Sequence, residues 1–123
     1  MAKNKAKDRK VCLRPRLRVM IGNEIALGPG RVDLLELIEE TGSLRAAAKR
    51  MGVSYMRAWK LVKSTNHSSH EPLVEVARGG KRGGGAKLTS AGRKAYQLYR
   101  DMEKQVHQAT RTSWTEMRKL LLE

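Results

Sequence analysis

The sequence is poor in the features that mark secreted and membrane proteins. It has one cysteine, Cys12, so no disulfide can form within the chain, which fits a reducing compartment. No apolar run approaches the ~20 residues that a transmembrane helix needs. Residues 1–10 are basic, but the apolar segment of a signal peptide does not follow them. We therefore expect a cytoplasmic protein with no membrane partner.

Acidic residues are also scarce. The 123 residues contain 26 Lys and Arg but only 12 Asp and Glu, which gives a formal net charge of +14 at pH 7. The sequence pI is near 10.5. A small domain this basic favours a polyanionic partner, and nucleic acid above all. The length predicts a single domain with tails.

The sequence contains no arrangement typical of an enzyme. No Ser/His/Asp, Cys/His or paired-carboxylate pattern emerges. The glycine-rich segment Gly79–Gly85 lacks the closing G-K-[ST] of a phosphate-binding loop and does not fit the dinucleotide-binding pattern. His67 and His70 could bind a metal, but no third ligand apart from the adjacent Glu71 stands at a suitable spacing. We therefore expect no enzyme, no cofactor and no metal site.

The stretch Ser43–Val62 has the spacing of two crossed helices. The glycine before it can end the preceding helix in the left-handed conformation, and Ser43 can cap the next helix. Two alanines allow a close crossing, and Gly52, four residues after the second of them, suits a turn with positive φ. The spacing predicts a helix-turn-helix whose second helix covers about residues 54–66.

This second helix has an apolar side and a basic side. At about 100° per residue, four residues share the side that turns inward, and these are Ala58, Leu61, Val62 and Thr65. Trp59 stands at the border and is expected to pack against a neighbouring helix. The outward side can donate to phosphates and to guanine edges in a major groove. The predicted DNA contacts of the helix-turn-helix are Ser43, Arg45, Ser54, Tyr55, Met56, Arg57, Lys60, Lys63 and Ser64.

Two further elements are predicted before the helix-turn-helix. Residues alternate from Leu13 to Met20 as in a half-buried strand, with Leu13, Leu17, Val19 and Ile21 on one side and Arg14, Arg16 and Arg18 on the other. A turn at residues 22–24 and a returning strand at 25–27 complete a hairpin. Apolar residues at helical spacing then predict a core helix that begins near Pro29 and ends at Thr41.

A second hairpin is predicted from Pro72 to Leu88. Its first strand contains Leu73, Val74 and Val76, and its return is residues 86–88. The tip is glycine-rich and basic, as in a DNA-binding wing that follows a phosphate backbone or places an arginine in a minor groove. The predicted DNA contacts there are Arg78, Lys81 and Arg82.

A long helix, capped by Thr89 or Ser90, is predicted after this hairpin. Its first two turns are expected to pack on the core, and its later turns extend beyond what a small core covers. A break at residues 110–113 and a final amphipathic segment follow. The apolar stripe has near-heptad spacing, so a second subunit is the simplest partner for it. The predicted dimer contacts are Leu98, Met102, Val106, Ala109, Trp114, Met117 and Leu121.

The order of these elements is that of a winged helix-turn-helix. The fold class is mainly α with small β, with an N-terminal β-hairpin, a basic Gly-rich wing and a long C-terminal dimerisation helix. Over roughly residues 13–105 the sequence resembles the DNA-binding domain of ModE-type molybdate-responsive transcriptional regulators, and its helix-turn-helix is also similar to that of LysR-type regulators. The stretches that carry this resemblance are 27–31 (LGPGR), 40–43 (ETGS), 46–48 (AAA), 51–55 (MGVSY), 57–59 (RAW), 71–74 (EPLV), the wing 79–85 and 88–92 (LTSAG).

The resemblance implies a sequence-specific transcriptional regulator that binds a pseudo-palindromic operator as a homodimer, through paired recognition helices and wings. In full-length members, molybdate-binding modules follow the DNA-binding domain. The chain stops at Glu123, without room for them, so the sequence implies neither molybdate sensing nor a small-molecule effector, and regulation by the protein's own concentration or by a partner stays open. We expect a flexible basic tail at 1–12, the winged helix-turn-helix at 13–90, and a C-terminal helix and tail for dimerisation at 91–123.

Two alternative functions stay open at this stage. A sequence-neutral architectural DNA- or RNA-binding protein would be equally basic, but it would bind specific and random sites almost alike. A protein-interaction module that has lost DNA binding would dock a partner on the wing or on the tail around Trp114. The many basic residues on the predicted DNA side favour DNA over this second alternative.

Overall fold

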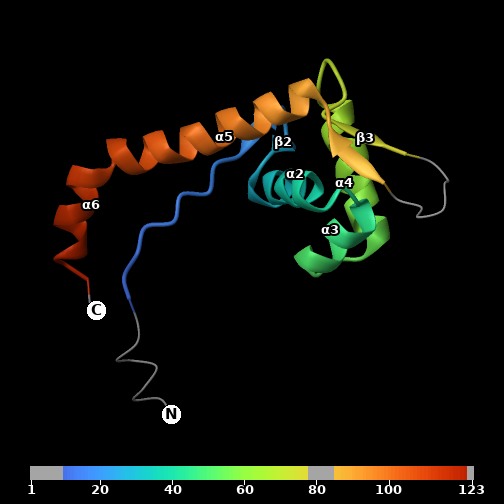
Figure 1. Ribbon diagram of the computed structural model, residues 1–123. Helices are drawn as coiled ribbons and strands as arrows, with labels where there is room; N and C mark the ends of the chain where they lie inside the picture. Colours follow the sequence, from blue (N-terminus) through green and yellow to red (C-terminus); the bar gives the residue numbers. More distant parts are fainter. Residues whose placement is uncertain (1–9, 78–84, 122–123) are drawn as a thin grey trace, which may run out of the picture. The chain divides into compact units, whose positions relative to one another are not determined.

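A computed structural model describes residues 10–77 and 85–121 of the chain, and Figure 1 shows it as a ribbon. The chain divides into two compact units, one formed by Arg16–Arg100 and the other by Met1–Pro15 with Asp101–Glu123. No helix within the described ranges is long and apolar enough to cross a membrane. In chain order the elements are β1 (Val19–Ile21), β2 (Glu24–Leu27), α2 (Pro29–Thr41), α3 (Leu44–Met51), α4 (Tyr55–His67), β3 (Val74–Val76), β4 (Ala86–Leu88), α5 (Ser90–Ala109) and α6 (Arg111–Arg118).

The first hairpin is shorter than the sequence predicts. Strand β1 pairs with β2 in antiparallel register from Ile21 opposite Glu24 to Val19 opposite Leu27. The predicted strand over residues 13–18 is wrong, because α2 begins directly after β2 and leaves no residues to pair with that segment. Val19 and Ile21 are 39% and 56% exposed instead of facing inward. A register shift between the first two residues of β1 interrupts the alternation there.

The turns around α3 have the predicted conformations. Gly42 ends α2 at φ 68°, and Gly52 ends α3 at φ 77°, both in the left-handed region that glycine adopts without a steric cost. The Ser43 hydroxyl accepts a hydrogen bond from the backbone N–H of Ala46 at 3.1 Å and so caps α3. Local chemistry therefore sets where α2 stops and α3 begins.

The core of the Arg16–Arg100 unit lies where α2, α3, α4 and the second hairpin meet, and Figure 1 shows these elements side by side. The side chains of Ala47, Ala48 and Ala58 are buried, and their small size lets α3 and α4 approach closely. The predicted inward side of α4 is confirmed, because Ala58, Val62 and Thr65 are buried and Leu61 packs against the core. Trp59 also packs against the core, as predicted.

Strands β3 and β4 form the predicted second hairpin, with Val74 opposite Leu88 and Val76 opposite Ala86. Asn66, in the last turn of α4, holds the start of this hairpin. Its side-chain oxygen accepts from the backbone N–H groups of Leu73 at 2.8 Å and Val74 at 3.1 Å, and its amide nitrogen donates to the Val74 carbonyl at 3.0 Å. One side chain thus ties the end of the second helix of the helix-turn-helix to the hairpin.

We expect Asn66→Ala to lower the free energy of unfolding by about 1–2 kcal/mol, because it removes the partner of three backbone groups in a half-buried place. Urea unfolding measures the effect. His67→Ala is the control, since His67 is the next residue and is exposed; we expect a change within about 0.5 kcal/mol. Equal midpoints for the two variants would contradict the anchoring role of Asn66.

The middle of α5 is fixed to α2 by a polar cluster. The Tyr96 hydroxyl donates to Glu36 Oε1 at 2.6 Å, and Arg100 Nη2 lies 3.3 Å from Asp33 Oδ1 and 3.4 Å from Glu36 Oε2. The bond to the Glu36 carboxylate raises the pKa of Tyr96. In addition, the buried Tyr99 donates from its hydroxyl to the Leu17 carbonyl at 2.7 Å. These bonds hold residues 96–100 of α5 against α2 and Leu17.

The junction between α5 and α6 is tighter than predicted. The sequence predicts a break over residues 110–113, but only Thr110 separates the two helices. The Trp114 N–H donates to the Thr110 carbonyl at 2.8 Å, and the Thr110 hydroxyl donates to the Val106 carbonyl at 2.7 Å. Helical bonding therefore resumes at once, and α6 ends at Arg118, before the last leucines of the predicted segment.

Candidate nucleic-acid interface

The outward side of α4 carries the predicted DNA-reading residues. Met56 is 58% exposed, and Arg57, Lys60 and Lys63 are exposed as well. Ser54 caps the helix by accepting from the Arg57 backbone N–H at 3.0 Å. Basic side chains at a spacing of three residues therefore follow one another along a solvent-facing side of a capped 13-residue helix.

The remaining predicted contacts of the helix-turn-helix lie in three places. The Arg45 guanidinium lies over the Tyr55 ring, 4.7 Å from its centre, so α3 contributes a cation–π contact that orients this half-buried tyrosine. Ser43 is half-buried and serves as the cap of α3. Ser64 is also half-buried, and its hydroxyl accepts from Arg31 at 3.0 Å. The capping and packing contacts of these side chains explain their positions without DNA.

The charge of this region has one sign. From Ser43 to His70 the sequence holds six basic residues and no Asp or Glu, and the basic residues are Arg45, Lys49, Arg50, Arg57, Lys60 and Lys63. Arg50 is 3.2 Å from Glu40, in an exposed pair at the end of α2. Helix α4 itself carries basic side chains on its outward side and contains no carboxylate.

Sequence reasoning missed Arg31 as part of this surface. Arg31, Ser54, Met56, Arg57, Lys60, Leu61 and Ser64 line one open hollow of about 380 Å³ beside α4. Arg31 comes from α2, 33 positions before Ser64, so helical periodicity gave no reason to link the two residues. The available signal is that Arg31 is the one basic residue in a helix with four acidic ones.

The other predicted site residues are placed as follows. The wing residues Arg78, Lys81 and Arg82 lie outside the described residues. Among the predicted dimer contacts, Leu98, Met102, Met117 and Leu121 are 52%, 42%, 55% and 47% exposed. Ala109 is exposed, whereas Val106 and Trp114 are half-buried.

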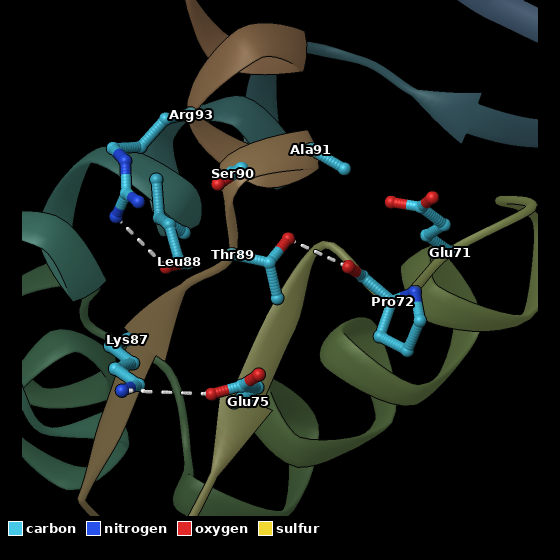
Figure 2. A pocket seen from close by; sticks show the side chains of 9 residues that line it. All are labelled: Glu71, Pro72, Glu75, Lys87, Leu88, Thr89, Ser90, Ala91 and Arg93. Atoms are coloured by element: carbon cyan, nitrogen blue, oxygen red, sulfur yellow. Dashed lines mark hydrogen bonds and ion pairs between the residues drawn. The ribbon is translucent and has the colours of Figure 1, made fainter.

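A second hollow, of about 540 Å³, lies where α5 begins, and Figure 2 shows the side chains that line it. Its charges are mixed. Lys87 Nζ is 3.7 Å from Glu75 Oε2, Arg93 donates to the Leu88 carbonyl at 3.1 Å, and Thr89 donates to the Pro72 carbonyl at 2.7 Å. The first pair joins β3 to β4, and the two hydrogen bonds join the start of α5 to the hairpin, so these groups have structural partners. In addition, no three metal-ligating side chains gather anywhere in the described part of the chain.

Comparison with known proteins gives a consistent result. Residues 30–93 match the model of the bacterial regulatory helix-turn-helix proteins of the lysR family. The chain is 43% identical over 83 residues to the transcriptional regulator ModE of Yersinia pestis. This alignment covers 68% of this chain and 32% of that protein. It is 44% identical over 78 residues to the molybdenum transport protein ModE of Azotobacter vinelandii, covering 63% and 29%. The chain spans about a third of the length of these relatives.

A solved structure shares the fold. The DNA-binding domain of CbnR, solved in complex with DNA, superimposes with a TM-score of 0.54 at 22% identity, covering 71% of this chain and 94% of that one. The fold is therefore a winged helix-turn-helix, mainly helical with two small two-stranded sheets. The family is one of regulators and not of enzymes, as the sequence predicts. Since the family match covers more than half of the chain, this protein belongs to the lysR family of bacterial regulatory helix-turn-helix proteins and carries a DNA-binding regulatory domain of the ModE/LysR type.

Proposed function

We propose that this chain reads a pseudo-palindromic operator sequence as a homodimer and thereby regulates transcription. The observation that carries the proposal is the outward side of α4, where Met56, Arg57, Lys60 and Lys63 are exposed on a capped helix without a carboxylate. In a helix-turn-helix this is the side that enters the major groove. The curated relatives that are named as transcriptional regulators support the same function.

The proposal divides the contacts by what they can recognise. Phosphate contacts set the register of the protein on the duplex, and we assign them to Ser54, Lys63 and the wing. Base edges carry the sequence, and we assign their readout to Tyr55, Met56, Arg57 and Lys60. The Arg45 guanidinium over the Tyr55 ring supports this division, because it holds the aromatic ring in place at the start of α4.

A homodimer fits the apolar residues that stay exposed toward the C-terminus. Leu98 and Met102 are one helical turn apart on α5, and Met117 and Leu121 are spaced alike in and after α6. Large exposed apolar side chains at helical spacing favour burial against another copy. A two-fold symmetric pair of α4 helices would then match an inverted repeat in the DNA.

Selection of bound fragments from random genomic DNA tests this function. We expect an inverted repeat whose half-sites are centred about one or two helical turns apart. Sedimentation of the free protein at micromolar concentration should give a dimer. Enrichment of DNA without any motif would favour a sequence-neutral architectural protein, and a monomer in sedimentation would contradict the role assigned to Leu98 and its neighbours.

A further inference from the structure

The positively charged guanidinium of Arg31 lies at the side of α4, and not all of its N–H groups have an acceptor. It is the third residue of α2, and its side chain is half-buried. Its Nη2 donates to Ser64 Oγ at 3.0 Å. Its Nε is buried and has no acceptor among the described residues. A guanidinium carries five N–H donors, and a buried charged donor without an acceptor is costly.

The surroundings of Arg31 suit an anion. The hollow of about 380 Å³ that it lines also contains the side chains of Arg57, Lys60, Ser54 and Ser64, and no carboxylate lines it. Three cations and two hydroxyl groups therefore face one open space. The neighbouring hollow, which shares Arg31 and Ser64, is also lined by Lys63, His67 and Glu24. No ion pair of Arg31 with a carboxylate is found in the described part of the chain, so its charge is not neutralised there.

We propose that Arg31, with Lys60 and Ser64, forms a phosphate site beside α4 that holds a backbone phosphate of DNA. This inference rests on the proposed function, because it requires the outward side of α4 to lie in a major groove. The planar guanidinium matches two oxygens of one phosphate. Nε is buried in the present rotamer, and a turn of the guanidinium toward the hollow would give it the phosphate acceptor that it lacks.

The position of Arg31 favours a phosphate over a base. Base edges are read by residues near the start of a recognition helix. Ser64 is ten residues beyond the cap Ser54, which is about 15 Å along the helix axis. Arg31 reaches this place from α2 and is held there by Ser64, so it lies at the side of α4 and not at its tip. A contact with the backbone adds affinity but reads no sequence.

The test compares Arg31→Met with Lys94→Met, which removes one charge from an exposed position on α5. Binding to a random-sequence duplex is measured over a series of salt concentrations. We expect Arg31→Met to bind about tenfold more weakly at low salt and to reduce the slope of log K against log [salt] by about 0.9, the value for one lost phosphate contact. Lys94→Met should keep the wild-type slope. Equal slopes for both variants would overturn the proposal.

A second measurement uses the wild-type protein and does not depend on how a variant folds. The Nε–H signal of Arg31 is assigned in an NMR spectrum by comparison with Arg31→Lys. Addition of duplex DNA should shift this signal and slow its exchange with water, because the N–H gains a phosphate acceptor. A signal that stays unchanged while the signals of α4 shift would contradict the site.

Titration with inorganic phosphate, without DNA, distinguishes the source of the anion. If free phosphate shifts the Arg31 signal at submillimolar concentration while DNA does not, the site takes a free oxyanion and the DNA contact is wrong. The proposed function fails on different data. A wild-type protein that binds the selected operator no better than random DNA would refute sequence reading, yet the salt slope and the Arg31 signal on random DNA would still support the phosphate site.

Discussion

Gly92→Ala is expected to destabilise the protein by about 3 kcal/mol or more, a large effect for the addition of one methyl group. A Cβ atom at Gly92 would overlap the carbonyl oxygen of Leu73 and would lie 3.0 Å from the carbonyl carbon. Both atoms belong to the backbone, so no side chain can rotate away. The same oxygen accepts a hydrogen bond from the Thr89 N–H at 3.0 Å, which fixes it in place.

The contacts around Gly92 explain why the chain cannot relax easily. The Gly92 N–H donates to Thr89 Oγ1 at 3.0 Å, and this hydroxyl donates to the Pro72 carbonyl at 2.7 Å, a bond that Figure 2 shows. A shift of α5 that made room for the methyl group would lengthen these bonds and uncover Leu73 and Leu88, which are 6% and 2% exposed. The strain therefore spreads to the junction of α5 with the hairpin.

Thermal and urea unfolding measure this effect against a matched control. Gly30→Ala makes the same change within α2, where a Cβ atom would meet nothing within 4 Å. Alanine is a better helix former than glycine, so Gly30→Ala should raise the free energy of unfolding by about 0.4–1 kcal/mol. We expect the midpoint of Gly92→Ala to fall by more than about 10 °C. Midpoints that differ by only a degree or two between the variants would disprove the close approach.

Features that depend on neighbouring residues in the chain could be predicted from the sequence. Gly42, Ser43 and Gly52 mark the ends of α2 and α3, and the structure gives each the predicted conformation or hydrogen bond. The burial of α4 also followed from its periodicity, because a helix with one apolar side has one way to face a core. In the same way Thr89, one of the two predicted caps, is the residue whose hydroxyl caps α5.

Features that depend on contacts between distant segments could not be predicted in this way. The length of β1 is set by where its partner strand ends, and the alternation of residues 13–20 does not contain that information. In the sequence, Asn66 is an ordinary polar residue at a helix end. Its role depends on Leu73 and Val74, which only the fold brings next to it. Arg31 could not be linked to α4 for the same reason, since only the crossing of α2 and α4 brings it to Ser64.

Arg57→Ala is expected to weaken binding to the operator by about 1–3 kcal/mol, a loss of up to roughly 150-fold, and to weaken binding to random DNA much less. Arg57 is exposed in the first turn of α4, and its guanidinium makes no hydrogen bond or ion pair within the described residues. It is therefore free to donate two hydrogen bonds to O6 and N7 of a guanine. Such a contact exists only when the correct base is present.

The comparison of two duplexes at one salt concentration isolates the base contact, because phosphate contacts contribute alike to both and cancel in the ratio of affinities. Lys63→Ala serves as the matched control, since Lys63 is exposed on the same helix and is assigned to a phosphate. Fluorescence anisotropy should show an unchanged ratio for Lys63→Ala and a reduced ratio for Arg57→Ala. Arg57→Lys keeps the charge but lacks the planar pair of donors. Compared with Arg57→Ala, it should therefore bind random DNA more tightly, while its ratio of operator affinity to random-DNA affinity stays reduced. Equal losses of Arg57→Ala on both duplexes would make Arg57 a phosphate contact and leave the reading of bases to Tyr55, Met56 and Lys60.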